Sequence, residues 1–276
     1  MSIVQTHLSD RAVVQLSGSD RVDFLQNLVT QNVAQIPQGG CVMAALLTPQ
    51  GKLLHDFLIH AENDCFYIDC AAAQAEALSK RLAMYKLRAD VSLSMTDLQV
   101  HALWQEDGYP CPPMAGFVED PRHEGLGLRG MFEAAPDVAL PQQDVSAWQH
   151  NRLRLGIPQG PDEMPPGTVF PLEFGLQHIQ AVDFQKGCFV GQEVTSRTHR
   201  KGRLRKSLRV IDIVGSAQSG DEISAEARIV GHIVAVDAAG ASGLALIRED
   251  AMASALRTAQ AEIRAVGGLF DAPASA

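Results

Sequence analysis

The sequence predicts an α+β fold with antiparallel sheets, followed by a small all-β domain, and three observations predict it. Within about the first 105 residues, short apolar runs typical of strands are interspersed with two stretches that have the apolar spacing of amphipathic helices. After residue 205 the pattern changes to short strands and turns. The P-loop pattern G-x-x-x-x-G-K-[ST] is absent, so the sequence gives no support for a P-loop site. The order of the elements favours antiparallel sheets over regular βαβ winding.

The first part of the chain contains two predicted helices and a predicted hairpin. The first helix covers Asp20–Val33, where Asp20 is a suitable N-cap and apolar residues follow at helical spacing. The second helix covers about Ala71–Arg88. The turn Thr48-Pro-Gln-Gly51 joins two apolar runs and indicates a hairpin. Strands are expected at Ala12–Leu16, Cys41–Leu47, Leu53–Ile59, Cys65–Asp69, Val91–Met95 and Leu98–Trp104.

The second part of the chain is rich in proline before it becomes all-β. Residues 105–146 hold six of the 14 prolines and are expected to be long connections at the boundary between two subdomains of an α+β region, 1–205. A short helix at Ala147–Gly156 and a rigid loop at Pro158–Pro171 follow. Four predicted strands indicate a small barrel over 206–267, and 268–276 is expected to be a frayed tail. These strands are Ser207–Val214, Arg228–Asp237, Ser242–Ile247 and Ala261–Val266.

Composition excludes several classes of protein. The chain is 46% hydrophobic and 20% charged, which are ordinary globular values and exclude bulk disorder and fibrous repeats. No apolar stretch approaches the ~18 residues of a membrane span, and Met1–Asp10 lacks the pattern of a secretory signal. Five cysteines without C-x-x-C spacing argue against a disulfide framework and a zinc ribbon, so no metal site is predicted. Reduced thiols indicate a cytoplasmic location, with Cys41, Cys65, Cys70 and Cys111 expected mostly as buried small hydrophobes.

Basic residues are concentrated in one short segment of an acidic chain. Seven of the 23 basic residues lie within Arg197–Arg209, which no acidic residue interrupts, and this leaves 16 basic against 32 acidic residues elsewhere. A cationic segment on an acidic body predicts a local site for a small polyanion, such as a phosphate or a polyglutamate tail. Double-stranded nucleic acid is not expected as the direct ligand, because the acidic body repels its backbone. The alternative is a solvated strand-and-turn face.

The segment from Phe184 to Arg197 has the most unusual composition. Gly187 and Gly191 bracket Cys188, and glycine permits a positive φ and the close approach of another group. The residues after Gly191 are expected to be helical, which places Cys188 just before a helix N-terminus with Lys186 two residues away. Both features favour a thiolate. The alternative is that Cys188 is a small packing residue and Lys186 a surface charge.

The stretch Lys186-Gly-Cys-Phe-Val-Gly-Gln-Glu193, with Arg197 four residues beyond, resembles the signature of the YgfZ-type folate-binding family. These proteins are iron–sulfur cluster assembly or repair factors related to the T protein (aminomethyltransferase) of the glycine cleavage system. Asp23–Val33, Leu47–Phe57 and Phe170-Pro-Leu-Glu173 are similar to other segments of the family. The resemblance therefore covers nearly the whole chain.

The resemblance implies a three-part cloverleaf, in which two α+β (ferredoxin-like) parts surround a central folate cavity and the third part is the C-terminal barrel. Glu173 would correspond to the carboxylate that anchors the pterin ring, since two parallel acceptors suit the ring's amino and ring N–H donors. The alternative is a surface loop acid. Lys186 and Cys188 would face the cavity as the chemically active residues. Cofactor-binding roles are implied for Asp56, Gln192, Glu193 and Arg197, with Arg197 and the basic segment holding the glutamate tail.

Two departures from T proteins are informative. T proteins carry two consecutive aspartates in the hairpin, where this chain has His55-Asp56, and usually carry aspartate where this chain has Cys188. Losing a carboxylate removes a candidate for the charge near the transferred methylene. Gaining a thiol adds soft-metal and redox capacity. Both changes favour the YgfZ-type interpretation over aminomethyl transfer.

The favoured hypothesis is a tetrahydrofolate-binding accessory factor for iron–sulfur enzymes, not a conventional turnover enzyme. Cys188 would meet a cluster, a folate-derived one-carbon adduct or an oxidised site on a client, and the resemblance implies clients that modify tRNA. One cysteine does not hold a cluster alone, because such sites generally need about four thiolates. The alternatives are an aminomethyltransferase acting on a lipoyl carrier and a nucleic-acid-binding module that uses Arg197–Arg209.

Overall fold

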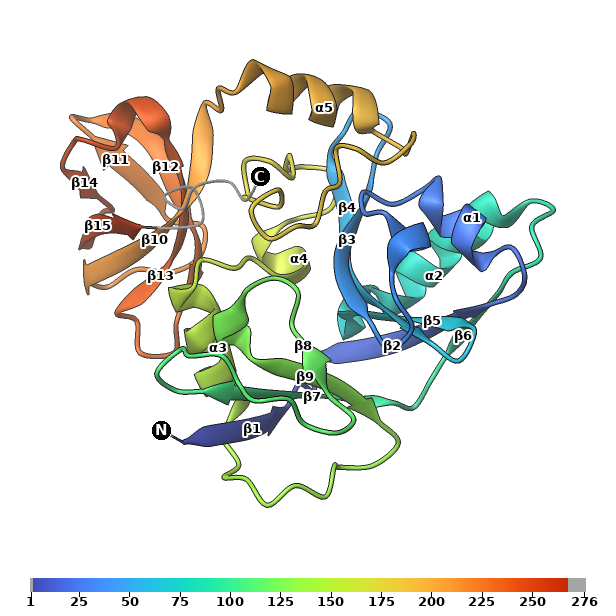
Figure 1. Cartoon of the computed structure of the whole chain (residues 1–276). Coiled ribbons are helices and arrows are strands. Elements are labelled where there is room, and N and C mark those ends of the chain that lie inside the picture. The colour runs from blue at the N-terminus through green and yellow to red at the C-terminus, as the bar shows by residue number, and fades with distance from the viewer. Residues whose placement is uncertain (1, 268–276) are drawn as a thin grey trace.

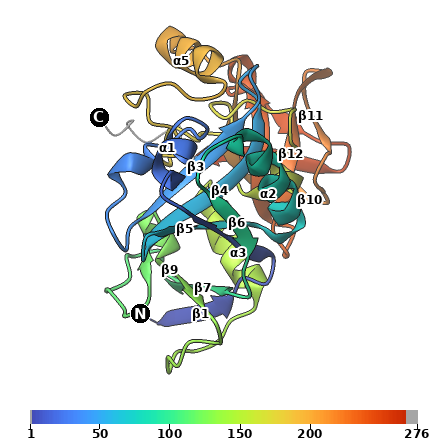
Figure 2. The same ribbon diagram turned by 90° about the vertical axis from the view of Figure 1, so that its right-hand side faces the viewer.

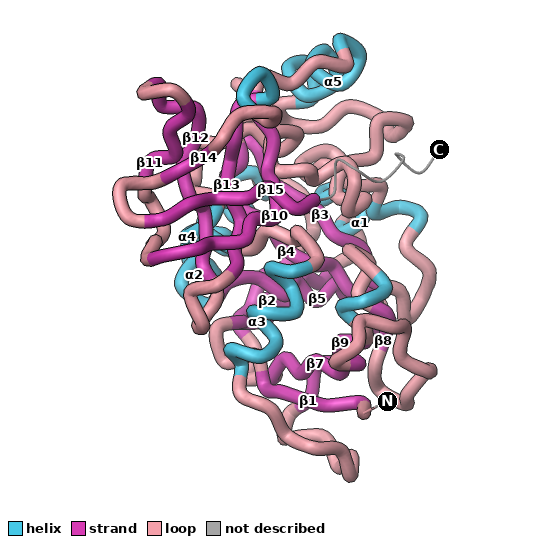
Figure 3. Tube along the Cα trace, turned by 90° about the vertical axis from the view of Figure 1, so that its left-hand side faces the viewer, coloured by secondary structure: helices cyan, strands magenta, loops and turns pink. Residues whose placement is uncertain are grey.

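The computed structural model describes residues 2–267, which form two antiparallel sheets and a closed barrel, with helices around them (Figure 1). The two sheets lie beside each other, and the barrel lies across from the five-stranded sheet. Loops occupy the space between these three parts, below the last helix (Figure 3). The predicted α+β class with a C-terminal barrel is confirmed. The predicted tail, 268–276, lies outside the described residues.

The first part is a five-stranded sheet covered by a helix on one face (Figure 2). Helix α2 (Ala72–Lys86) contributes Leu78 and Leu82 to a core that also contains Phe57 and Ile59 of the sheet. Burying each such side chain contributes about 1.5–3 kcal/mol. The strands, in spatial order, are β3 (Cys41–Leu47), β4 (Leu53–Glu62), β5 (Cys65–Ala71), β2 (Arg11–Ser17) and β6 (Ser92–Met95).

The first predicted helix is much shorter in the structure, because tertiary contacts replace its second half. Helix α1 covers Arg21–Gln26, and a 3₁₀ turn, η1, covers Val33–Gln35. Between them Thr30 donates its backbone N–H to Ala45 on β3, and Val29 forms an isolated bridge with Leu46. Asp20 precedes α1 as predicted, but its carboxylate accepts the backbone N–H of Asp90 instead of capping the helix.

The second part is a four-stranded sheet packed against helix α3 (Val145–Arg154). Trp104 on the sheet and Trp148 on α3 meet edge to face, with ring centroids 5.6 Å apart, inside the largest apolar core. Gly125–Gly130 has the spacing G-x-G-x-x-G, but it leads from a 3₁₀ turn into a strand and not into a helix, so it is not a dinucleotide loop. The strands are β1 (Ile3–His7), β7 (Gln99–Gln105), β9 (Leu128–Phe132) and β8 (Val118–Glu119).

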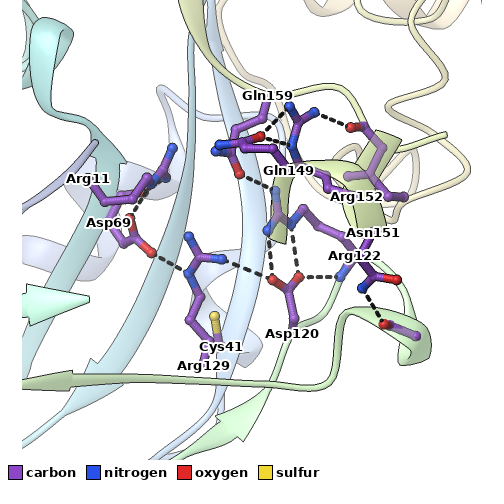
Figure 4. Close-up of polar contacts among 12 residues, drawn as sticks. Arg11, Cys41, Asp69, Asp120, Arg122, Arg129, Gln149, Asn151, Arg152 and Gln159 are labelled. Carbon is purple, nitrogen blue, oxygen red and sulfur yellow. Dashed lines mark hydrogen bonds and ion pairs between the residues drawn. The ribbon is translucent and has the colours of Figure 1, made fainter. Parts of the chain in front are cut away.

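Buried ion pairs join the two sheets (Figure 4). Asp69 on β5 contacts Arg11 at 2.7 Å and Arg129, on β9 of the other sheet, at 2.5 Å. Asp120 contacts the same Arg129 at 3.1 Å and Arg122 at 2.7 Å. All five side chains are at most 1% exposed. Each charge therefore depends on its partners, since an unpaired buried charge is costly.

His60 on β4 lies at the edge of this cluster and predicts an acid-sensitive fold. Its imidazole is 3.5 Å from the thiol of Cys41, and Asp69, Arg129, Asp120 and Arg11 are the charges around it. Burial lowers the pKa of His60 to about 4 from its usual 6.5. Between those values the unfolded chain binds a proton that the folded chain does not, so stability falls as pH falls.

We expect His60 to remove about 3 kcal/mol of unfolding free energy between pH 6.5 and 4. Urea unfolding at several pH values measures this loss, and a His60→Gln variant serves as the comparison. The interpretation is wrong if both proteins lose stability with the same slope over that range.

The third part is the closed barrel, with an apolar core of its own. It is tied to α3 by His150, whose Nδ1 lies 2.9 Å from the carboxylate of Asp237. Two of its strands, β11 and β14, are short and were not predicted. In order around the barrel the strands are β10 (Lys206–Gly215), β13 (Ser242–Arg248), β12 (Arg228–Val236), β11 (Glu222–Ala225), β14 (Leu256–Arg257) and β15 (Ala261–Gly267).

Candidate functional site

A pocket of about 210 Å³ opens between the β3–β4 turn, the loop that ends at Glu173 and helix α5 (Gln192–Lys201). Helix α5 lies across the top of the molecule between the barrel and the first sheet (Figure 1). Residues from four separate stretches of sequence meet here. The lining residues are Gly51, Phe170–Glu173, Val194, Thr195, Thr198 and Arg203–Arg205.

Glu173 presents a half-buried carboxylate to this pocket. Its backbone carbonyl accepts the N–H of Leu208 at 2.9 Å, which fixes the residue against the first barrel strand. Burial raises the pKa of the Glu173 carboxyl, and the positive charge of Lys206 acts in the opposite direction. Within residues 2–267 no side chain donates a hydrogen bond to this carboxylate. The group is thus free to accept donors from a ligand.

Two glycines set the N-terminus of α5 on the hairpin turn. Gly191 precedes the helix with φ +82°, and a Cβ there would lie 2.6 Å from the carbonyl oxygen of Thr48. Gly51 in the turn has φ +77°, and a Cβ there would lie 2.9 Å from Cβ of Val194. Only glycine permits both this backbone conformation and this approach. Gly191, three residues after Cys188, is therefore required by the contact between α5 and the hairpin turn.

We expect Gly191→Ala to destabilise the fold by about 2–3 kcal/mol, because the left-handed conformation alone costs roughly 1–2 kcal/mol and the clash with Thr48 adds to it. Gly187→Ala is the matched control, since a Cβ added there would meet nothing within 4 Å and its φ is not positive. Thermal unfolding of both variants measures the difference. Equal melting temperatures would show that α5 does not depend on the close contact of Gly191 with the hairpin turn.

The two faces of α5 differ in what they contact. Val194, Thr195 and Thr198 face the pocket, whereas Glu193 and Arg197 are exposed on the other side. Gln192, Glu193 and Arg197, which were expected to bind the cofactor, are therefore on the helix but do not line the pocket. The pocket is instead lined by Thr195 and Thr198 on the helix and by Arg203 and Arg205 after it. The i, i+4 spacing of Val194 and Thr198 places them on one face of a helix, and it was the sequence pattern that could have identified this face.

Cys188 is exposed, and Lys186 is buried. The ammonium of Lys186 donates to the carbonyls of Val29 at 2.6 Å and Gln31 at 2.8 Å. Burial lowers the pKa of Lys186 to about 8, and Asp183 opposes that change. Neither residue lines the pocket, although Cys188 lies four residues before the helix that does.

Asp56 is buried on β4, away from the pocket. Its carboxylate accepts the backbone N–H of Gly160 at 3.1 Å, at the start of helix α4 (Gly160–Glu163). The neighbouring His55 contacts Gln74 on α2 at 3.1 Å. The structure thus places the predicted hairpin carboxylate and the predicted Glu173 in different surroundings.

The basic segment separates into an exposed and a buried part. Five of its side chains are exposed, and no acidic side chain of residues 2–267 forms an ion pair with them. Arg209 is buried and contacts Glu249 at 3.1 Å, so it does not belong to the exposed patch. Lys206 is half-buried beside Glu173. The exposed residues are Arg197, Arg200, Lys201, Arg203 and Arg205.

The four cysteines other than Cys188 differ in how deeply they are buried. Cys70 and Cys111 are buried, whereas Cys41 and Cys65 are half-buried, so the expectation of burial was right for only two of the four. Among the described residues, no group of three or more His, Cys, Asp or Glu side chains is arranged to hold a metal ion. No helix in the same part of the chain is long and apolar enough to cross a membrane.

Sequence comparison finds relatives with one shared description. The mitochondrial iron–sulfur cluster assembly factor IBA57 of Mus musculus is 29% identical over 304 residues, which cover 94% of this chain and 82% of that protein. The IBA57 homologue of Mycosarcoma maydis is 33% identical, covering 72% of this chain and 54% of that protein. Human IBA57 is 30% identical, covering 73% and 64%. The chain thus spans between half and two thirds of the fungal and human relatives. No model of a known protein family matches.

Structural comparison finds the fold in a solved enzyme. The glycine cleavage system aminomethyltransferase T of Bartonella henselae superposes with a TM-score of 0.74, over 96% of this chain and 85% of that chain. The two sequences are only 12% identical, so this likeness concerns the fold.

The predicted cytoplasmic location is wrong. The relatives compared above are all mitochondrial proteins, which points to the mitochondrion. The predicted family, in contrast, agrees with both comparisons. The chain's sequence relatives are IBA57 iron–sulfur cluster assembly factors and its fold is that of the glycine cleavage T protein, as the resemblance to the YgfZ-type family predicted.

Proposed function

We propose that this protein is a tetrahydrofolate-binding accessory factor that acts in iron–sulfur cluster assembly. The assembly role comes from its IBA57 relatives. The folate proposal is carried by Glu173, a carboxylate that lines the pocket and accepts no hydrogen bond from any side chain of residues 2–267. A pterin ring presents an amino group and ring N–H groups side by side, which a carboxylate accepts as a pair of parallel hydrogen bonds.

The size of the pocket fits part of a folate. Pockets that enclose drug-sized ligands measure roughly 300–1,000 Å³, so about 210 Å³ suits the bicyclic ring and leaves the rest outside. Phe170, Leu172 and Val194 supply apolar contacts for the ring faces. No part of the fit requires a metal ion.

The remaining part of folate ends in carboxylates, and the exposed arginines at the pocket lie in a suitable place for them. Arg203 and Arg205 line the pocket, and Arg197, Arg200 and Lys201 continue along α5. Guanidinium groups bind carboxylates through two parallel hydrogen bonds. A polyglutamate tail running from the pocket along this helix would neutralise charges that no acidic side chain of the described residues balances.

Calorimetric titration with tetrahydrofolate and with 5-formyl-tetrahydrofolate tests the folate proposal. Trp104 and Trp148 are buried in the central core and do not line the pocket, so heat is a better signal than tryptophan fluorescence. We expect Glu173→Gln to weaken binding by about 10- to 100-fold, because one charge-assisted hydrogen bond is worth about 1.5–3 kcal/mol.

Glu76→Gln is the matched control for this titration, since Glu76 is exposed on α2 and pairs only with Lys80 among the described residues. Binding by the unchanged protein that Glu173→Gln does not weaken would place the folate elsewhere. Absence of binding by the unchanged protein would reject folate as its ligand.

Aminomethyl transfer is the second candidate, because the fold is that of the T protein. It requires a carboxylate near the reactive folate nitrogen, and the hairpin candidate Asp56 accepts a hydrogen bond from Gly160 and does not line the pocket. We therefore favour the accessory role. An assay with aminomethyl-lipoyl carrier protein separates the two, since turnover at ordinary rates of ~1–10³ s⁻¹ would support the transferase.

A further inference from the structure

Gly187 and Cys188 form the exposed crest of a short arch between two buried side chains. Lys186 on one side is 6% exposed, and Phe189 on the other is 7% exposed. Both residues of the crest are exposed. A thiol presented in this way keeps contact with solvent while its backbone is held from both ends.

The Lys186 side of the arch is fastened to a distant loop. Its ammonium donates to the carbonyls of Val29 and Gln31, at 2.6 and 2.8 Å, and these lie between α1 and η1. The same nitrogen is 5.4 Å from the ring centroid of Phe189, so the two anchors meet beneath the crest. Charge-assisted hydrogen bonds of this kind are about twice as strong as neutral ones.

Further hydrogen bonds join the residues before Lys186 to the same loop. Asp183 accepts the backbone N–H of Lys186 at 3.1 Å and donates its own N–H to the carbonyl of Thr30 at 3.0 Å. The hydroxyl of Thr30 donates to Ala181 at 2.6 Å. The Lys186 ammonium is the last of these polar attachments before the crest, and the buried Phe189 ring is the anchor after it.

We propose that Lys186 is a positioning residue, which holds Cys188 in place by fastening the arch to the loop between α1 and η1. Two of the three N–H donors of its ammonium are directed at carbonyls, and among the described residues no hydrogen bond joins the ammonium to the Cys188 thiol. The proposal takes from the sequence interpretation only that Cys188 is the chemically active residue. The mechanical role of Lys186 follows from its own contacts.

The test is the mobility of a nitroxide label attached to Cys188. Cys41 and Cys65 are half-buried, so both are first replaced by alanine to leave Cys188 as the accessible thiol. In this background Lys186→Met removes the donors at similar length, and Lys201→Met removes an exposed charge from α5. We expect the rotational correlation time of the label to fall at least threefold in Lys186→Met and to stay unchanged in Lys201→Met.

Hydrogen exchange on the full, unlabelled chain gives a second measurement. Peptides that cover Gly187–Val190 are expected to exchange at least tenfold faster in Lys186→Met than in Lys201→Met. Lys186→Gln keeps one donor group and serves if Lys186→Met does not fold, with an intermediate increase expected. The proposal is overturned if label mobility and exchange in the folded Lys186 variant match those of the Lys201 control.

The positioning role of Lys186 and the requirement for the Cys188 thiol fail in distinguishable ways. If the crest loosens in the Lys186 variant while Cys188→Ala retains full activity in cells, the positioning role stands and the role of the thiol falls. If Cys188→Ala is inactive while the crest stays rigid without Lys186, the thiol is required and the positioning role is wrong.

Discussion

The proposed role in iron–sulfur cluster assembly predicts that cells that depend on this protein lose iron–sulfur enzyme activity when Cys188 is replaced by alanine or by serine. The side chain is exposed at the crest of a held arch, so neither substitution removes a packing contact or leaves a cavity. Serine is of similar size but carries a hydroxyl in place of the thiol, and so lacks the nucleophilicity and soft-metal affinity of a thiolate. A loss common to both variants therefore reports the chemistry of sulfur.

The measurement is client-enzyme activity in cells that lack the chromosomal gene and carry each variant on a plasmid. Activity is expected to fall to the level of the empty vector, with protein abundance and melting temperature unchanged. Cys65→Ala is the matched control, because Cys65 is half-buried and, among residues 2–267, its thiol accepts only a hydrogen bond from the side-chain amide of Gln15. Full activity from both Cys188 variants would remove the thiol from the mechanism.

Asp69→Asn is expected to lower the free energy of unfolding by about 3–5 kcal/mol. Burial opposes ionisation of Asp69, but Arg11 and Arg129 outweigh it and hold the pKa of that carboxyl well below its usual range. Asparagine has the same shape without the charge. It would leave Arg11, Arg122 and Arg129 buried against Asp120 alone.

Urea unfolding at pH 7 measures this loss, and Asp64→Asn provides the control. Asp64 also pairs with an arginine, Arg21 at 3.1 Å, but its side chain is 97% exposed. Exposed pairs are worth about 0–1 kcal/mol, and asparagine tolerates the positive φ at this position. A similar small change in both variants would show that the buried network adds no net stability at Asp69.

Acid should weaken the same region in a predictable direction. The depressed pKa of Asp69 means that its contribution to stability is complete above the ordinary aspartate pKa and is lost as pH falls through the folded value. The loss due to His60 begins at higher pH, from about 6.5. Acid unfolding is therefore expected to begin with the histidine.

Local sequence patterns predicted much of the fold because their causes are local. The periodicity of Ala71–Arg88 predicted α2, the Pro-x-Gly turn predicted the β3–β4 hairpin, and the glycine at 191 preceded a helix as expected. Strand β1, with the sequence Ile-Val-Gln-Thr-His, was missed because two of its polar residues are buried. The amide of one of them, Gln5, bonds to the carbonyls of Val138 and Leu140, which lie far away in the sequence.

By itself, the sequence determined the family signature, the order of most elements, the uneven charge and the thiol before a helix. Only the tertiary structure decided what the charged side chains contact. It directs Lys186 to carbonyls about 155 residues away, buries Arg209 against Glu249, and leaves Glu173 without a side-chain donor among the described residues. The physical reason is that a charge is stabilised by whichever group the fold brings within about 3 Å, and sequence spacing says little about that distance.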